Sequence, residues 1–132
     1  MKTILNTSLV CTLFFSSCKK EPYVPNYRNT AGYVIGKEIC HNNANEDYWL
    51  IDLTYYSNTP RYGDTLVLNG TTYNNVVKVK GLGDRLQEVG KKASFDFRTI
   101  SNQKIQTTGC TASSPITYLL KELFPINQFE IL

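Results

Sequence analysis

Apolar and polar residues alternate with a period of two over several stretches beyond Gly32, which is the pattern of half-buried β-strands. The predicted inward faces are Trp49, Ile51, Leu53 and Tyr55 in one stretch, and Ala93, Phe95 and Phe97 in another. A weaker alternation at 33–40 predicts Tyr33, Ile35 and Ile39 as inward-facing. The chain after Gly32 is therefore predicted to consist mainly of short strands.

Turn residues separate these stretches. Asn69-Gly70 follows the apolar run 64–68 and predicts a tight hairpin, whose return strand carries Val77 and Val79 on one face. The segment 84–89 reads as one or two helical turns, capped by Asp84 and ended by Gly90. The segment 116–124 fits a strand or a helix, with Pro125 expected to end either and a further short strand expected around Phe129.

The predicted fold class is mainly β: a small antiparallel barrel of five or six strands with one short helix. The step from Leu86 through Gly90 to Phe95, which is a helical turn, a glycine and a strand, resembles the entry into the fourth strand of an OB-type barrel. The order of three strands, a helix and two strands also resembles that fold. A β-sandwich is the alternative.

The first residues resemble a bacterial export signal. Lys2 precedes an apolar run that is too short to span a membrane, and the small residues Ser16 and Ser17 follow it. Phe15-Ser16-Ser17-Cys18 resembles the lipobox of bacterial lipoproteins, which implies cleavage before Cys18 and lipid attachment to its sulfur. By resemblance to the sorting rule of that family, Lys19 implies the outer membrane of a Gram-negative cell. The predicted organisation is a signal peptide at 1–17, a lipidated tether at 18–31 and a β-barrel domain at 32–132.

The four cysteines have different predicted fates. Cys11 leaves with the signal and Cys18 takes the lipid, so Cys40 and Cys110 are left in an oxidising compartment, where a disulfide between them is expected. Two free thiols, or half of a metal site with His41, are the alternatives. No metal is expected, because zinc needs four ligands and nothing in the sequence supplies them.

Composition argues against several functions. The net charge of the full chain is +3, and the basic residues are scattered rather than concentrated, so no nucleic-acid partner is expected. His41 is the only histidine, and the carboxylates Asp47, Asp52, Asp64 and Asp96 lack the spacing of a calcium loop. A pair of carboxylates for glycoside hydrolysis would meet only in three dimensions, and nothing in the sequence favours one. No catalytic residue and no cofactor are predicted.

The tyrosines are the main candidates for a binding surface. The chain has nine, and Tyr48, Tyr56 and Tyr62 fall at strand ends or in loops, the last beside Arg61. Exposed tyrosines suit recognition of glycans or proteins, although tyrosines can also simply line and rim a small barrel. Separately, Asp64-Thr65-Leu66 resembles a short motif modified by some bacterial glycosylation systems, which would make Thr65 a glycosylation site.

Three functions remain open at this stage. The first is a non-enzymatic, lipid-anchored binding module for a glycan or protein partner. The second is an inhibitor of a lytic enzyme such as lysozyme, with 42–47 or 57–63 as a protruding loop. The third, ranked last, is a periplasmic hydrolase. The sequence predicts no particular oligomeric state.

Overall fold

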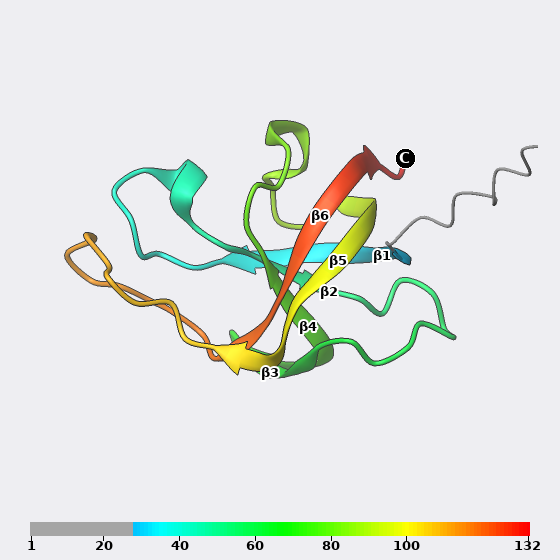
Figure 1. Ribbon diagram of the computed structural model, residues 1–132, viewed down its shortest axis with the longest axis horizontal. Helices are drawn as coiled ribbons and strands as arrows, with labels where there is room; N and C mark the ends of the chain where they lie inside the picture. The colour runs from blue at the N-terminus through cyan, green and yellow to red at the C-terminus, as the bar shows by residue number, and fades with distance from the viewer. Residues whose placement is uncertain (1–27) are drawn as a thin grey trace, which may run out of the picture.

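The strands form a single sheet that curls round on itself (Figure 1). A computed structural model describes residues 28–132, apart from the side chains of 99–101. The predicted signal at 1–17, Cys18 and most of the predicted tether lie outside the described residues. In chain order the elements are β1 Arg28–Lys37, the 3-10 turn η1 Ala44–Glu46, β2 Trp49–Asp52, β3 Asp64–Leu68, β4 Thr71–Val79, the 3-10 turn η2 Asp84–Leu86, β5 Lys92–Ile105 and β6 Leu120–Glu130.

Strand pairing follows a closed circuit. The strand β1 pairs with β2, β2 with β4, β4 with β6, β6 with β5, and β5 with β1. The contact between β4 and β6 is parallel and involves two residue pairs, whereas the other contacts are antiparallel. With η2 between β4 and β5, this is the strand order expected of an OB-type barrel, closed narrowly at its one parallel contact. The strand β3 is extra and pairs with β4.

The core has two parts. The larger one fills the barrel and includes the predicted inward faces Trp49, Ile51, Leu53, Ala93, Phe95 and Phe97, together with Val77 and Val79. A smaller one lies on the outer side of β2 and β4, where Leu50, Val76 and Leu120 are covered by Leu66 and Leu68 of β3 and by Tyr73. The strand β4 serves both parts, because successive side chains point to opposite faces of the sheet: Val77 and Val79 belong to the barrel core and Val76 to the outer cluster.

Three turn residues adopt the conformations that their sequence predicts. Asn69 and Gly70 have φ values of +49° and +80°, as a type I′ hairpin requires, and they join β3 to β4. Gly90, which was expected to end a helix, has φ of +95°. The helix itself is shorter than predicted, because it is a single 3-10 turn that begins after Gly83 and has no side-chain cap from Asp84.

The predicted register of β1 is wrong. Val34 is buried, whereas Tyr33 and Ile39 are exposed and Ile35 packs on the outer core. An irregularity between Val34 and Gly36 in the pairing with β2 shifts the alternation, which a period-two reading cannot detect. The strand also begins at Arg28, four residues before the predicted domain boundary.

The ambiguous C-terminal segment is an extended connection followed by a strand. The strand β6 runs through Pro125, which pairs with Phe97 of β5, so the expectation that proline ends the element is wrong. Beyond Leu123, β6 pairs with β5 and no longer with β4, so a missing N–H at Pro125 leaves no ladder hydrogen bond unmade on that side.

Candidate functional site

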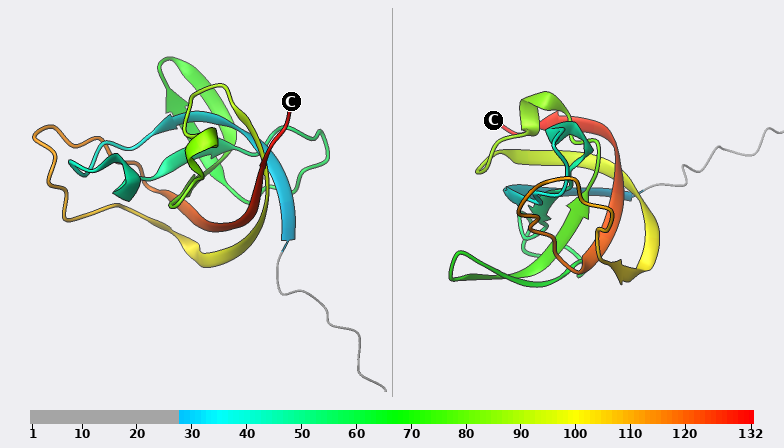
Figure 2. Two further views of the ribbon diagram at one scale, coloured as in Figure 1. Left: turned by 90° about the horizontal axis from the view of Figure 1, so that it is seen from above. Right: turned by 90° about the vertical axis from the view of Figure 1, so that its left-hand side faces the viewer.

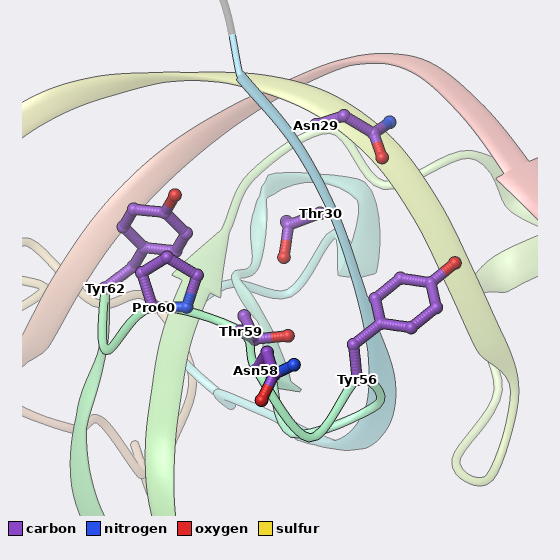
Figure 3. Close-up of a pocket in the computed structure, with 7 residues that line it drawn as sticks. All are labelled: Asn29, Thr30, Tyr56, Asn58, Thr59, Pro60 and Tyr62. Atoms are coloured by element: carbon purple, nitrogen blue, oxygen red, sulfur yellow. The ribbon is translucent and has the colours of Figure 1, made fainter.

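A pocket of about 250 Å³ opens at one mouth of the barrel. Its walls come from the start of β1 and from the 56–62 loop (Figure 3). The lining residues are all uncharged: Asn29, Thr30, Tyr56, Asn58, Thr59, Pro60 and Tyr62. Mouths of β-barrels are common places for small-molecule sites, and the mixture here of aromatic rings, amides and hydroxyls is suited to a polar, neutral ligand.

Hydrogen bonds to the side chain of Asn75 on β4 fix the 56–62 loop, which forms one wall of the pocket. The Asn75 side chain is 5% exposed, accepts a hydrogen bond from the Gly63 amide at 2.7 Å and donates to the carbonyls of Leu53 and Pro60. Gly63 packs against the backbone of Val76 so closely that a Cβ there would lie 2.4 Å from the Val76 oxygen. The wall is therefore held in shape before any ligand arrives.

Two tyrosines stand on opposite sides of the pocket (Figure 3). The Tyr62 ring meets Phe97 of the barrel core edge-on, with ring centroids 5.1 Å apart, and the Arg28 guanidinium lies 5.8 Å from the Tyr62 centroid. The Tyr56 ring is 54% exposed and packs edge-on against Tyr55 at 4.8 Å. Both rings are positioned by aromatic contacts and still present surface to the pocket.

Thr30 lies at the floor of the pocket and carries a buried hydroxyl without a partner among the described residues. It pairs with Phe95 in the β1–β5 ladder, so its side chain belongs to the inward-facing row of the barrel. Thr30 is 4% exposed, and its hydroxyl has no hydrogen-bond partner among the described residues. In Figure 3 this hydroxyl points into the space between the two tyrosines. Buried hydroxyls are usually paired, so an unpaired one facing a pocket marks a place where something can bind.

The structure brings together part of the predicted binding set. Tyr56 and Tyr62 line the same pocket, while the adjacent Arg61 is exposed and donates a hydrogen bond to Thr65 Oγ1 at 2.9 Å. Tyr48 does not line this pocket: it is the last residue of the 38–48 loop, which carries η1 and lies at the opposite end of the barrel (Figures 1 and 2). Thr30 was missed because it fell in the predicted tether.

Tyr48 covers a buried charged network instead. The side chains of Lys78 and Glu38 have 0% exposure and are 3.0 Å apart, and Lys78 also donates to Thr107 Oγ1 and the Tyr118 carbonyl. The Lys78 ammonium lies 4.9 Å from the Tyr48 ring centroid. Burial, together with the hydrogen bond to the Glu122 carboxylate, raises the pKa of Tyr48 to about 12. This network connects the outer side of β4 to the loops around it, and its polar groups form hydrogen bonds with one another.

The predicted disulfide is confirmed. Cys40 and Cys110 are bonded, with an S–S distance of 2.01 Å, and the bridge joins the 38–48 loop to the 106–119 loop. The carbonyl of Cys40 also accepts hydrogen bonds from the amides of Thr111 and Ala112, and Asp47 accepts from the amides of Cys40 and His41. The two loops project together from the end of the barrel away from the pocket (Figure 1).

The face that OB-type barrels use for oligosaccharides and oligonucleotides, the outer side of the second and third strands, is occupied here. In this chain that face belongs to β2 and β4, and Leu50, Val76 and Lys78 on it are buried under β3 and the 106–119 loop. Since Leu50, Val76 and Lys78 are buried, these positions offer a ligand no accessible surface, and the barrel mouth is the better candidate.

A second, larger depression of about 770 Å³ lies between η2 and the end of β6. Two of its polar side chains are already engaged: Gln128 bonds to the backbone of Gly81 and Gly83, and Glu130 pairs with Lys91 at 2.5 Å. No unpartnered buried polar atom faces it among the described side chains. It is consequently a weaker candidate than the mouth pocket.

The carboxylates do not gather into a reactive centre. Asp64 accepts from the Lys121 amide and lies 3.3 Å from Lys104, and Asp96 accepts from Asn29 and Asn127. Burial raises the pKa of Asp52, whose carboxylate accepts a hydrogen bond from Thr54. Within residues 28–132 no cluster of three or more His, Cys, Asp or Glu side chains could hold a metal ion. In the same range no helix is long and apolar enough to cross a membrane.

Thr65, the residue of the glycosylation-like motif, lies on β3 and is exposed. The aspartate before it is 7% exposed and engaged in the contacts described above. The Thr65 hydroxyl is reachable from solvent, whereas the aspartate is not readily available to a modifying enzyme in the folded protein. Comparisons of the chain with protein-family models, with curated proteins and with solved structures find no match.

Proposed function

We propose that the protein is a lipid-anchored lipoprotein of the cell envelope whose barrel binds a glycan, without catalysis, in the mouth pocket. The observation that carries this proposal is the placement of two tyrosines on opposite sides of an uncharged pocket whose lining also includes amides and hydroxyls. Aromatic rings provide large contact areas at low entropic cost, and amides and hydroxyls match the hydrogen-bonding groups of sugars. Two of the carboxylates that a hydrolase could use, Asp64 and Asp96, already accept hydrogen bonds within the protein.

The proposed glycan site is tested on Tyr56. We expect Tyr56→Ala to weaken glycan binding by about 30-fold, which corresponds to about 2 kcal/mol for a central aromatic anchor. The measurement is a glycan array with the purified protein, followed by titration of the strongest ligand. Phe129→Ala is the matched control, because Phe129 is 64% exposed but lies on β6 and does not line this pocket. If Tyr56→Ala binds the glycan as tightly as the unchanged protein, the glycan does not bind in the mouth pocket.

The proposed anchor rests on the lipobox resemblance at Cys18. Several acyl chains hold a protein firmly in a bilayer, since each buried CH₂ contributes about 0.8 kcal/mol. We propose that the resulting protein sits in the outer membrane of a Gram-negative cell. The pocket lies at the start of β1, whose residues Asn29 and Thr30 line it.

Cys18→Ser is expected to abolish incorporation of an alkyne-labelled fatty acid and to move the protein out of the membrane fraction of a Gram-negative host. Cys11→Ser is the control, because Cys11 belongs to the predicted signal and should not affect labelling. Persisting label in Cys18→Ser would argue against lipidation at this residue.

A further inference from the structure

We infer that the mouth pocket accepts a single uncharged sugar ring and that a hydroxyl of this ring pairs with Thr30 Oγ1. The inference rests on the proposed glycan-binding function and specifies the ligand of that same site. It identifies Thr30, which the sequence alone placed in a tether, as a specificity-determining residue.

The first argument is that the buried hydroxyl of Thr30 has no hydrogen-bond partner among the described residues. Thr30 lies beside residues of the hydrophobic core. On β5, Phe95 is directly opposite Thr30, and Phe97 lies two residues beyond Phe95. A valine would fill the same space, is equally suited to a strand and would leave no polar atom unpaired. Burying an unpaired hydroxyl is unfavourable. A threonine at this position becomes favourable once a ligand supplies the missing hydrogen bond.

The second argument is the absence of charge in the pocket wall. The seven lining residues are uncharged, and the Asn29 amide is already committed to Asp96 and the Phe95 carbonyl. Arg28 lies beside Tyr62 but is exposed and outside the lining. A carboxylate or phosphate would lose hydration on entering and would find no opposite charge in the wall. The pocket therefore favours a neutral ligand over an acidic sugar.

The third argument is size and free hydrogen-bonding capacity. At about 250 Å³ the pocket is smaller than the roughly 300–1,000 Å³ of sites for drug-sized molecules, so it suits one ring rather than several. Asn58 and Thr59 add an amide and a hydroxyl next to Thr30, with Tyr56 and Tyr62 at the sides (Figure 3). A ring bearing hydroxyls on its edges and apolar C–H groups on its faces matches this arrangement.

The test uses Thr30→Val, which removes the hydroxyl and keeps the shape, and Thr30→Ser, which keeps the hydroxyl. The probes are the methyl glycosides of glucose, galactose, mannose and N-acetylglucosamine, with methyl glucuronide as the charged comparison, titrated into the ¹⁵N-labelled protein. We expect at least one neutral glycoside to shift the amide signals of Thr30, Tyr56 and Asn58. Thr30→Val should weaken that binding about tenfold, while Thr30→Ser should stay within about threefold.

A measurement without ligand gives an independent reading of the same hydroxyl. Because Thr30→Val removes an unpaired buried group, it should raise the midpoint of thermal unfolding by about 4 °C. A lower midpoint would mean that the hydroxyl has a partner within the protein, which would overturn the inference.

The outcomes also separate this inference from the proposed function. If Tyr56→Ala loses binding but Thr30→Val binds as well as the unchanged protein, the glycan site stands and the role of Thr30 is refuted. Tighter binding of the glucuronide than of every neutral glycoside would refute the neutral-ring assignment. If no glycoside shifts a lining residue and no array glycan binds, both proposals fail.

Discussion

Replacing Lys78 by methionine is expected to lower the free energy of unfolding by about 3–5 kcal/mol. The change removes the cation that pairs with Glu38 while the carboxylate stays behind, fully buried and still hydrogen-bonded to Thr107 and to the Tyr118 amide. A buried charge without its partner is far more costly than the loss of one surface contact. Urea denaturation, followed by circular dichroism, measures the change.

Two variants make this result specific. Lys80→Met removes an exposed ammonium two residues further along, 5.9 Å from the same Tyr48 ring, and should change the free energy of unfolding by less than about 0.5 kcal/mol. The double variant Glu38→Leu/Lys78→Met should recover much of the lost stability, since no unpaired charge is then left in the interior. Equal stability of Lys78→Met and Lys80→Met would show that the pair is not desolvated in solution.

Removing the disulfide is the second change with a large expected effect. On the chain-entropy account, a bridge between residues 70 positions apart stabilises the folded state by about 4 kcal/mol, so Cys40→Ala/Cys110→Ala should lower the free energy of unfolding by about that amount. Glycan binding should change little in the folded variant, because the bridged loops lie at the end of the barrel away from the pocket (Figures 1 and 2).

Mass spectrometry provides the matching control on the bridge itself. Alkylation of the unreduced protein should leave Cys40 and Cys110 unlabelled, and a linked peptide pair should appear after digestion. Labelling of either cysteine before reduction, or an unchanged free energy of unfolding in the double variant, would contradict this account.

The inward faces of β2 and β5 were predictable from the sequence, because one face of each strand is in the barrel core and the other is outside it. Trp49, Ile51 and Leu53 alternate with residues outside the barrel, and Phe95 and Phe97 do the same in β5, so period two revealed the core directly. The hairpin at Asn69-Gly70 was equally predictable, since its backbone conformation is one that these residues adopt at low cost.

The errors arise where a residue's environment depends on distant partners. Because the pairing of β1 with β2 is irregular between Val34 and Gly36, no single alternation fits the whole strand, and such irregularities leave no mark in the sequence pattern. Pro125 is accommodated because β6 has lost its pairing with β4 at that point, which is a property of the sheet rather than of the local sequence.

Only part of the candidate site was predictable, because it also depends on partners that are distant in the sequence. Tyr56 and Tyr62 stand out as aromatic residues flanking a polar loop, but their proximity to Thr30 depends on pairing between residue 30 and residue 95. Tyr48 carries the same sequence signal as Tyr56, yet it packs beside a buried lysine at the other end of the barrel. Local composition therefore identified the residue type of the site without identifying its members.

The most direct test of the glycan-binding claim is a crystal structure of the protein with the strongest neutral glycan from the array. The account predicts one sugar ring between Tyr56 and Tyr62, with a ring hydroxyl within hydrogen-bonding distance of Thr30 Oγ1. A glycan bound elsewhere, for example on the bridged loops, with the mouth pocket holding solvent alone, would contradict it.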